Sequence, residues 1–120
     1  MAYDSYQAER IRRSFKDRKL YVEEKKMFGG LCFMLDGKMC CGILYSKKRS
    51  TDLLMARVGP GAYDQCMEHK GAHPMDFTGR PMNGFIFVTP DGYDSESDLS
   101  FWIDACIAYN PEAKSSKKRR

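Results

Sequence analysis

The side chains of this sequence that could perform chemistry together are Arg57, Asp76 and Arg80. Asp76 and Arg80 belong to the segment 73–84 (HPMDFTGRPMNG), in which prolines and glycines stand at turn-forming positions. Because Asp76 lies between two apolar residues, we expect its carboxylate to be partly buried and to need a cationic partner. The two arginines could form an anion or substrate site with it. The alternative is a structural salt bridge that fixes this segment to the sheet.

The cysteines do not indicate a catalytic or disulfide-bonded protein. Their number is odd, no Cys-x-x-Cys occurs, and most of them lie in apolar runs, which is typical of reduced, buried thiols in a cytoplasmic protein. No histidine stands close in sequence to Cys40 and Cys41, so neither has an evident base to activate it. We assign no catalytic residue, and the sequence favours a non-catalytic protein over an enzyme. The cysteines are Cys32, Cys40, Cys41, Cys66 and Cys106.

Neither a metal nor a cofactor is expected from the motifs. Cys66 and His69 are three residues apart and could offer two ligands on one helix end, but a metal site needs three or four. The turn that begins at Gly59 lies between a predicted strand and a helix, where phosphate-binding loops occur. It has Asp64 where a dinucleotide-binding loop has its third glycine, and no Walker sequence is present.

The positive charge of the chain is concentrated in its last residues. Removing their five charges from the net charge of +4 leaves −1 for residues 1–113, which we predict to form a single domain. We expect residues 114–120 to be disordered and either to attract nucleic acid weakly or to act as a solubilising tail. No apolar run approaches the roughly 20 residues of a membrane span, and no secretory signal is evident. The basic residues are Lys114, Lys117, Lys118, Arg119 and Arg120.

Apolar periodicity and turn residues predict an α+β domain. We expect a mostly antiparallel sheet of about five strands, with N- and C-terminal helices packed on it and one short helix before the last strand. Asp36-Gly37 is a strong type I′ hairpin signal. The predicted helices cover residues 4–17, 59–68 and about 95–110, and the predicted strands cover 21–27, 31–35, 39–45, 52–58 and 85–88.

Two central strands are apolar on both faces, and this bears on assembly. In the third strand, alternation places Met39, Cys41 and Ile43 on one face and Cys40, Gly42 and Leu44 on the other. Strands of this kind are covered on both faces, and the predicted helices are too few for both. The sequence therefore predicts a homodimer in which a second subunit covers the remaining face.

Four ordered blocks resemble the TfoX N-terminal domain. The resemblance covers about residues 3–110 and implies a small α+β domain with a mostly antiparallel sheet. In the full-length competence regulators, this domain precedes a second, helical domain, and those proteins act with a transcription factor at promoters. The present chain stops at its basic tail. The blocks are 24–30 (EKKMFGG) with 37–39 (GKM), 54–60 (LMARVGP) with Tyr63, 74–82 (PMDFTGRPM), and the closing helix around Leu99 and Trp102.

These observations predict a cytoplasmic, non-catalytic regulatory or protein-interaction domain. Its working surface would be the sheet and the segment 76–84, with Arg57, Asp76 and Arg80 as candidate contacts. One alternative is a nucleic-acid-associated accessory factor that uses the basic tail and the arginines of the first helix, which we expect to face solvent. A small enzyme with an unrecognised site is the other alternative.

Overall fold

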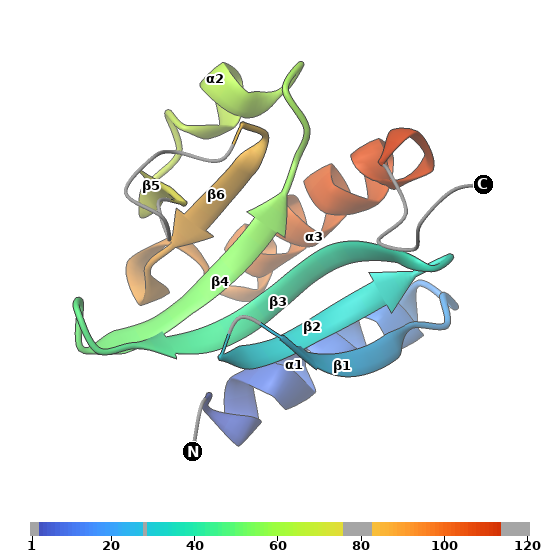
Figure 1. Cartoon of the computed structure of the whole chain (residues 1–120), viewed down its shortest axis with the longest axis horizontal. Coiled ribbons are helices and arrows are strands. Elements are labelled where there is room, and N and C mark those ends of the chain that lie inside the picture. The colour runs from blue at the N-terminus through green and yellow to red at the C-terminus, as the bar shows by residue number, and fades with distance from the viewer. Residues whose placement is uncertain (1–2, 28, 76–82, 114–120) are drawn as a thin grey trace.

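The centre of the chain is a six-stranded antiparallel sheet with strand order β1-β2-β3-β4-β6-β5 (Figure 1). The structure is a computed structural model, and it describes residues 3–27, 29–75 and 83–113. The strands are β1 (Glu23–Met27), β2 (Gly30–Leu35), β3 (Lys38–Ser46), β4 (Thr51–Arg57), β5 (Ala72–Pro74) and β6 (Phe85–Val88). The helical segments are α1 (Ser5–Asp17), α2 (Tyr63–Cys66), η1 (Pro90–Gly92), α3 (Glu96–Tyr109) and η2 (Asn110–Glu112).

The two long helices pack on one face of the sheet, as the α+β prediction required (Figure 1). Asp4 caps α1 by accepting a hydrogen bond from the backbone N–H of Tyr6, and Ser95 caps α3 in the same way for Asp98. The apolar faces of both helices then meet the sheet in the main core, to which α1 and α3 contribute Ala8, Ile11, Phe15, Leu99, Trp102, Ile103 and Cys106. Within the described residues, no helix has the length and apolar character needed to cross a membrane.

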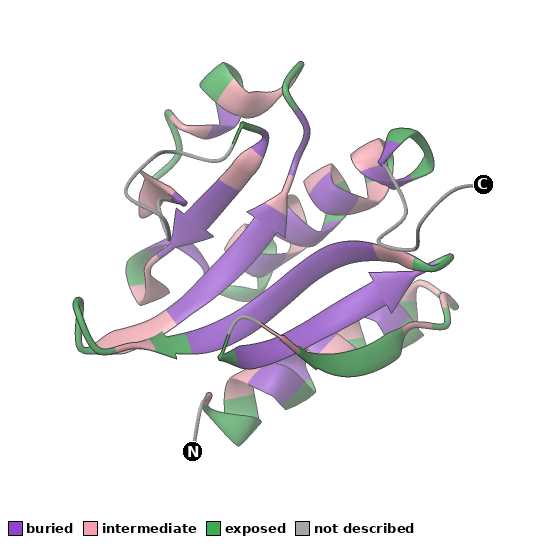
Figure 2. Ribbon diagram, in the orientation of Figure 1, coloured by how far each residue is buried: buried purple, intermediate pink, exposed green. Residues whose placement is uncertain are grey.

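The other face of the sheet carries a second, smaller core (Figure 2). Its residues are at most 5% exposed in a single chain, so their burial requires no second subunit. The premise of the homodimer prediction, that a second subunit is needed to cover this face, therefore does not hold. The homodimer itself stays a prediction. This core consists of Cys32, Met34, Met39, Leu44, Leu53, Met55, Met75 and Phe87.

A bulge in β3 makes the predicted face alternation wrong. Phe33 pairs with Cys41, but Met34 pairs with Met39, so Cys40 is an extra residue without a partner in β2. As a result, Cys40 joins Cys41 in the main core, and Met39 turns to the second core. The Asp36-Gly37 turn itself has the positive φ angles (56° and 77°) of the predicted type I′ hairpin.

The structure differs from the prediction in two further respects where the chain runs from β4 to β6. The helix expected over residues 59–68 is only Tyr63–Cys66, because Gly59 has a φ of 86° and the chain reaches a helical turn only after Ala62. A sixth strand, β5, was not predicted. It has three residues and one of them is proline, so its identity as a strand depends on pairing with β6.

The carboxylate of Asp52 in β4, which contacts the residue preceding α1, provides a test of local electrostatics. Asp52 accepts a hydrogen bond from the backbone N–H of Asp4 (3.1 Å), and burial, with a smaller contribution from the Asp4 charge, raises the pKa of its carboxyl. A raised folded-state pKa means that ionisation of Asp52 destabilises the fold as pH rises through its titration. We expect Asp52→Asn, which can still accept the Asp4 bond, to raise the free energy of unfolding at neutral pH by about 0.5 kcal/mol, since the site is partly solvated.

Urea denaturation at neutral pH and below the ordinary pKa of aspartic acid would measure this effect. In acid, the carboxyl is protonated in both the folded and the unfolded chain, so the difference between variant and wild type should vanish. A gain that was the same at both pH values would contradict the explanation.

Candidate functional site

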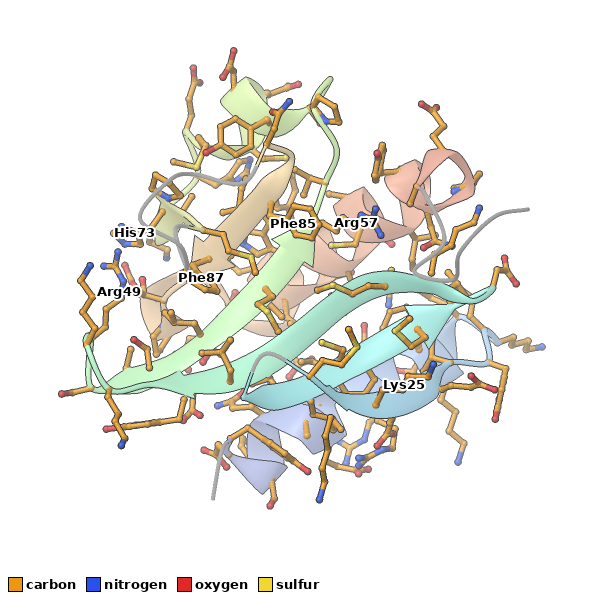
Figure 3. All side chains as sticks on the ribbon, in the orientation of Figure 1. Lys25, Arg49, Arg57, His73, Phe85 and Phe87 are labelled. Atoms are coloured by element: carbon orange, nitrogen blue, oxygen red, sulfur yellow. The ribbon has the colours of Figure 1, made fainter. Side chains whose placement is uncertain are left out.

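Arg57, the first predicted site residue, ends β4 and contacts three other segments (Figure 3). Its Nη1 donates a hydrogen bond to the carbonyl of Met39, next to the β3 bulge (3.2 Å). Its guanidinium carbon lies 5.3 Å from the ring centre of Phe85 and 6.0 Å from that of Tyr109, which is within the range of cation–π contact. In the described part of the chain, no carboxylate forms an ion pair with it. These contacts hold the half-buried side chain in place.

The other predicted contacts fall outside the described residues. Asp76 and Arg80 belong to residues 76–82, and the basic tail is residues 114–120. Whether Arg57 pairs with Asp76, and whether the three residues contact a ligand or partner, therefore stays a prediction. The same holds for the nucleic-acid contacts assigned to Lys114, Lys117, Lys118, Arg119 and Arg120.

The structure also contains a large concave surface that the sequence did not indicate. It is a cleft of about 590 Å³ at the end of the molecule where three segments meet, and we call it the end cleft. The connection from α1 to β1, the β2–β3 hairpin and the junction of α3 with η2 form its walls. Figure 1 shows where these elements lie in the fold. Its lining residues are Lys19, Leu20, Tyr21, Glu23, Met34, Leu35, Asp36, Gly37, Ile107, Asn110 and Pro111.

The lining of the end cleft combines apolar and polar groups. Leu20 and Ile107 give apolar surface, while Lys19, Glu23 and Asp36 bring charges of both signs. Tyr21 is 81% exposed and is the most exposed large hydrophobic residue of the described chain. Its neighbour Leu20 packs against the main core, so the backbone that carries the exposed ring is anchored.

Asn110 forms a buried polar part of the same wall and is only 2% exposed. Its Nδ2 donates a hydrogen bond to the carbonyl of Leu35 (3.0 Å) and joins η2 to the end of β2. Lys38 reinforces this junction, since its Nζ donates to the carbonyls of Asn110 (3.3 Å) and Pro111 (3.1 Å). A cation at this position also suits the negative end of the α3 dipole.

The model of the TfoX N-terminal domain family matches residues 18–109. The chain belongs to this family. The match covers the whole sheet and α3, including Arg57 and most of the end cleft, whereas α1 precedes it. No curated protein and no solved structure shows significant similarity to the chain.

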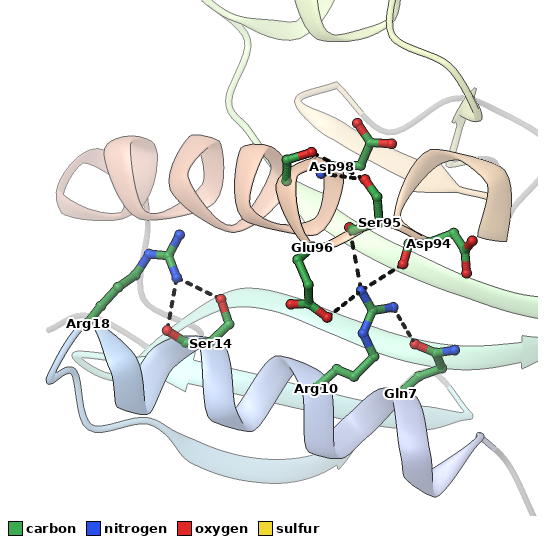
Figure 4. A network of polar contacts seen from close by, with 9 residues as sticks. Gln7, Arg10, Ser14, Arg18, Asp94, Ser95, Glu96 and Asp98 are labelled. Atoms are coloured by element: carbon green, nitrogen blue, oxygen red, sulfur yellow. Dashed lines mark hydrogen bonds and ion pairs between the residues drawn. The ribbon is translucent and has the colours of Figure 1, made fainter.

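In this TfoX N-terminal domain, the arginines of the first helix are engaged within the molecule. Arg10 was expected to face solvent, but it is only 7% exposed because the start of α3 lies against it. It contacts Gln7, the carbonyls of Asp94 and Ser95, and Glu96 (Figure 4).

The remaining arginines of this region also have acidic partners. Arg12 forms ion pairs with Glu9 and with Glu24 of β1, and the pKa of Glu24 is lowered chiefly by its hydrogen bond to Arg12. Arg13 pairs with Glu9. Just after the helix, Arg18 forms an ion pair with Asp104 of α3. Its Nη1 also donates hydrogen bonds to the carbonyl and hydroxyl oxygens of Ser14 (Figure 4). These arginines connect α1 to α3 and to the edge of the sheet, and they do not form an unpaired basic stripe.

The thiols of the domain are free and buried, as the sequence predicted. Burial raises the pKa of the Cys32 thiol to about 11, and burial also raises the pKa of Cys66 and Cys106. A hydrogen bond with Cys40 and burial raise the pKa of Cys41. Reactive cysteines have the opposite property, a lowered pKa and access to solvent, so these environments do not favour thiol chemistry.

His69, considered above as a metal ligand together with Cys66, belongs to no suitable cluster in the part of the chain that the structure describes. Within the described residues, no group of three or more histidine, cysteine, aspartate or glutamate side chains could hold a metal ion. His69 instead stacks on Phe101 of α3, with 3.8 Å between the ring centres. His73 lies in β5, directly opposite Phe87 of β6.

Proposed function

We propose that this TfoX N-terminal domain is a non-catalytic, regulatory protein-interaction domain, and that the end cleft is the surface that binds its partner. The observation that carries the proposal is the end cleft itself, with an exposed aromatic residue on an anchored backbone at its edge. Tyrosine is enriched in protein interfaces because it offers a large contact area at a small entropic cost. Its 81% exposure in the single chain is explained if a partner covers it.

The surroundings of the other candidate groups support this proposal over the alternatives. A cysteine that serves as a catalytic nucleophile needs a lowered pKa. Burial instead raises the pKa of the Cys32 and Cys66 thiols. Nucleic-acid binding through the first helix would need unpaired cations on one face, whereas Arg10, Arg12 and Arg18 have acidic partners. The tail remains the candidate source of nucleic-acid binding, and such binding would weaken steeply with salt.

Two exposed tyrosines allow a matched test of the end cleft. Tyr21 borders the cleft, whereas Tyr6 is 67% exposed on α1 and does not line it. The chain and its Tyr21→Ser and Tyr6→Ser variants would be purified from native lysate, and bound proteins would be quantified by mass spectrometry. We expect Tyr21→Ser to reduce recovery of a specific partner about tenfold, since an interface tyrosine often contributes more than about 1 kcal/mol. Tyr6→Ser should leave recovery unchanged.

Thermal unfolding would check that both variants keep the wild-type fold, as expected for side chains this exposed. A partner that is recovered equally well by Tyr21→Ser would refute the cleft as its binding surface. Strong binding to nucleic acid in mobility shifts at physiological salt, surviving deletion of residues 114–120, would refute the protein-interaction proposal in favour of the nucleic-acid alternative.

A further inference from the structure

The strand β1 forms one edge of the sheet, and its four charged residues are all exposed (Figure 2). Within the residues that the structure describes, β2 is its only strand neighbour. The outer backbone groups of such an edge can pair with a strand of another chain. Charged side chains limit which strands can do so, and the pattern of charges therefore selects the partner. The four residues are Glu23, Glu24, Lys25 and Lys26.

On each face of β1, an acidic residue precedes a basic residue by two positions. Residues that lie opposite each other in an antiparallel pair share a face of the sheet. Glu23 and Lys25 lie opposite residues of the second core, so they are on that face. Glu24 and Lys26 lie opposite residues of the main core, so they are on the face that the helices cover. A strand with this order meets opposite charges when a copy of itself runs antiparallel beside it.

Two registers of such a pair bring opposite charges together. Because opposite residues share a face, the two-fold axis between identical antiparallel strands passes through a residue of β1. An axis at Glu24 places Glu23 of each copy opposite Lys25 of the other. An axis at Lys25 places Glu24 opposite Lys26, but it also places two lysines opposite each other.

The axis at Glu24 brings two carboxylates together, and charges already present in each copy compensate for them. Arg12 of α1 donates hydrogen bonds to Glu24 through Nε and Nη2. Arg12 also pairs with Glu9, and Glu9 pairs with Arg13, so the charges of these four residues cancel. Lys25 has no ion-pair partner in the described part of the chain, so an axis there lacks this compensation. The charges therefore favour the axis at Glu24.

We propose that two copies of this chain associate through antiparallel pairing of their β1 strands, centred on Glu24, to form one continuous sheet. The net charge of only +4 opposes this association weakly. The interface differs from the one that the sequence suggested, because it uses an edge of the sheet instead of a face. The inference goes beyond the proposed function, in which the end cleft binds a different protein.

Charge reversal in β1 tests the pairing. Glu23→Lys places lysines opposite each other, Lys25→Glu places glutamates opposite each other, and by symmetry each change acts twice. Association of the purified full chain would be measured by sedimentation equilibrium at low salt. We expect the wild type to dimerise at micromolar concentration, each single variant to dimerise about tenfold more weakly, and the double variant to regain wild-type affinity. Lys47→Glu, at an exposed position of the β3–β4 hairpin, makes the same charge change as Lys25→Glu and should have no effect.

A mixture of the two single variants is the sharpest comparison. The Glu23→Lys chain offers two lysines to the two glutamates of the Lys25→Glu chain, so the mixture should associate more tightly than either variant alone. A monomeric wild type, a mixture no tighter than its components, or an equal effect of Lys47→Glu would each overturn the inference. Thermal unfolding would check the fold of each variant, since all the positions are exposed. These measurements concern self-association of the purified chain, so their failure would leave the Tyr21 result for the end cleft unaffected.

Discussion

Trp102→Ala is expected to lower the free energy of unfolding by about 3–5 kcal/mol, the usual effect of deleting a fully buried aromatic side chain. Trp102 is 1% exposed and lies in the main core between α3 and the sheet. Its Nε1 donates a hydrogen bond to the carbonyl of Gly92 (3.0 Å), so alanine would also leave that buried acceptor without its donor. Such a loss is a large fraction of the roughly 5–15 kcal/mol that stabilises a typical domain.

Trp102→Phe separates the two contributions. Phenylalanine retains most of the ring volume but removes the N–H, so we expect a loss of about 1–2 kcal/mol. Both variants would be compared with wild type by urea denaturation. Circular dichroism is the suitable signal, because Trp102 is the single tryptophan of the chain and its fluorescence disappears with it. A loss below about 1 kcal/mol for the alanine variant would contradict the packing described here.

Gly30→Ala is expected to destabilise the domain far more than Gly29→Ala, although the two glycines are adjacent. A Cβ on Gly30 would lie 2.3 Å from the carbonyl oxygen of Ile43 and 2.5 Å from Leu44 Cβ, so β2 and β3 would have to separate. A Cβ on Gly29 would meet nothing within 4 Å, but the φ of 75° at this position is unfavourable for other residues. We expect a loss of about 3 kcal/mol for Gly30→Ala and about 1 kcal/mol for Gly29→Ala.

Denaturant unfolding of the two single variants provides this comparison, and each variant is the control for the other. Both substitutions add one methyl group and reduce the freedom of the unfolded chain equally. The difference between them therefore isolates the contact between β2 and β3. Equal losses, or a larger loss for Gly29→Ala, would show that backbone conformation and not close strand approach makes glycine necessary here.

The parts of the fold that could be predicted are those whose signals are local. Ser95 and the apolar spacing from Leu99 onward specify α3, and Asp36-Gly37 specifies the β2–β3 hairpin. The bulge at Cys40 could not be predicted, because it arises from the register between two strands and every residue around it is apolar. The burial of Arg10 likewise depends on α3, whose start follows it by more than eighty residues.

The candidate site was harder to predict than the fold. Arg57 was predicted as a candidate contact and cationic partner for Asp76, but its contacts with Phe85 and Tyr109 come from two later segments. The end cleft joins Tyr21 and Asn110, which are far apart in sequence. Neither has a motif around it: Tyr21 reads as the start of an edge strand, and Asn110 as the last residue before a proline that stops a helix. Only folding brings them to the same wall.

The buried thiols have a practical consequence for studying this domain. They are distributed over β2, β3, α2 and α3, and all of them are buried in the folded domain. Alkylation by a reagent such as iodoacetamide therefore requires the surrounding element to open, and the rate of labelling at each position measures how often it does. The wild-type chain thus carries its own set of reporters, one or more in each of four elements, and local opening can be followed without introducing a single foreign residue.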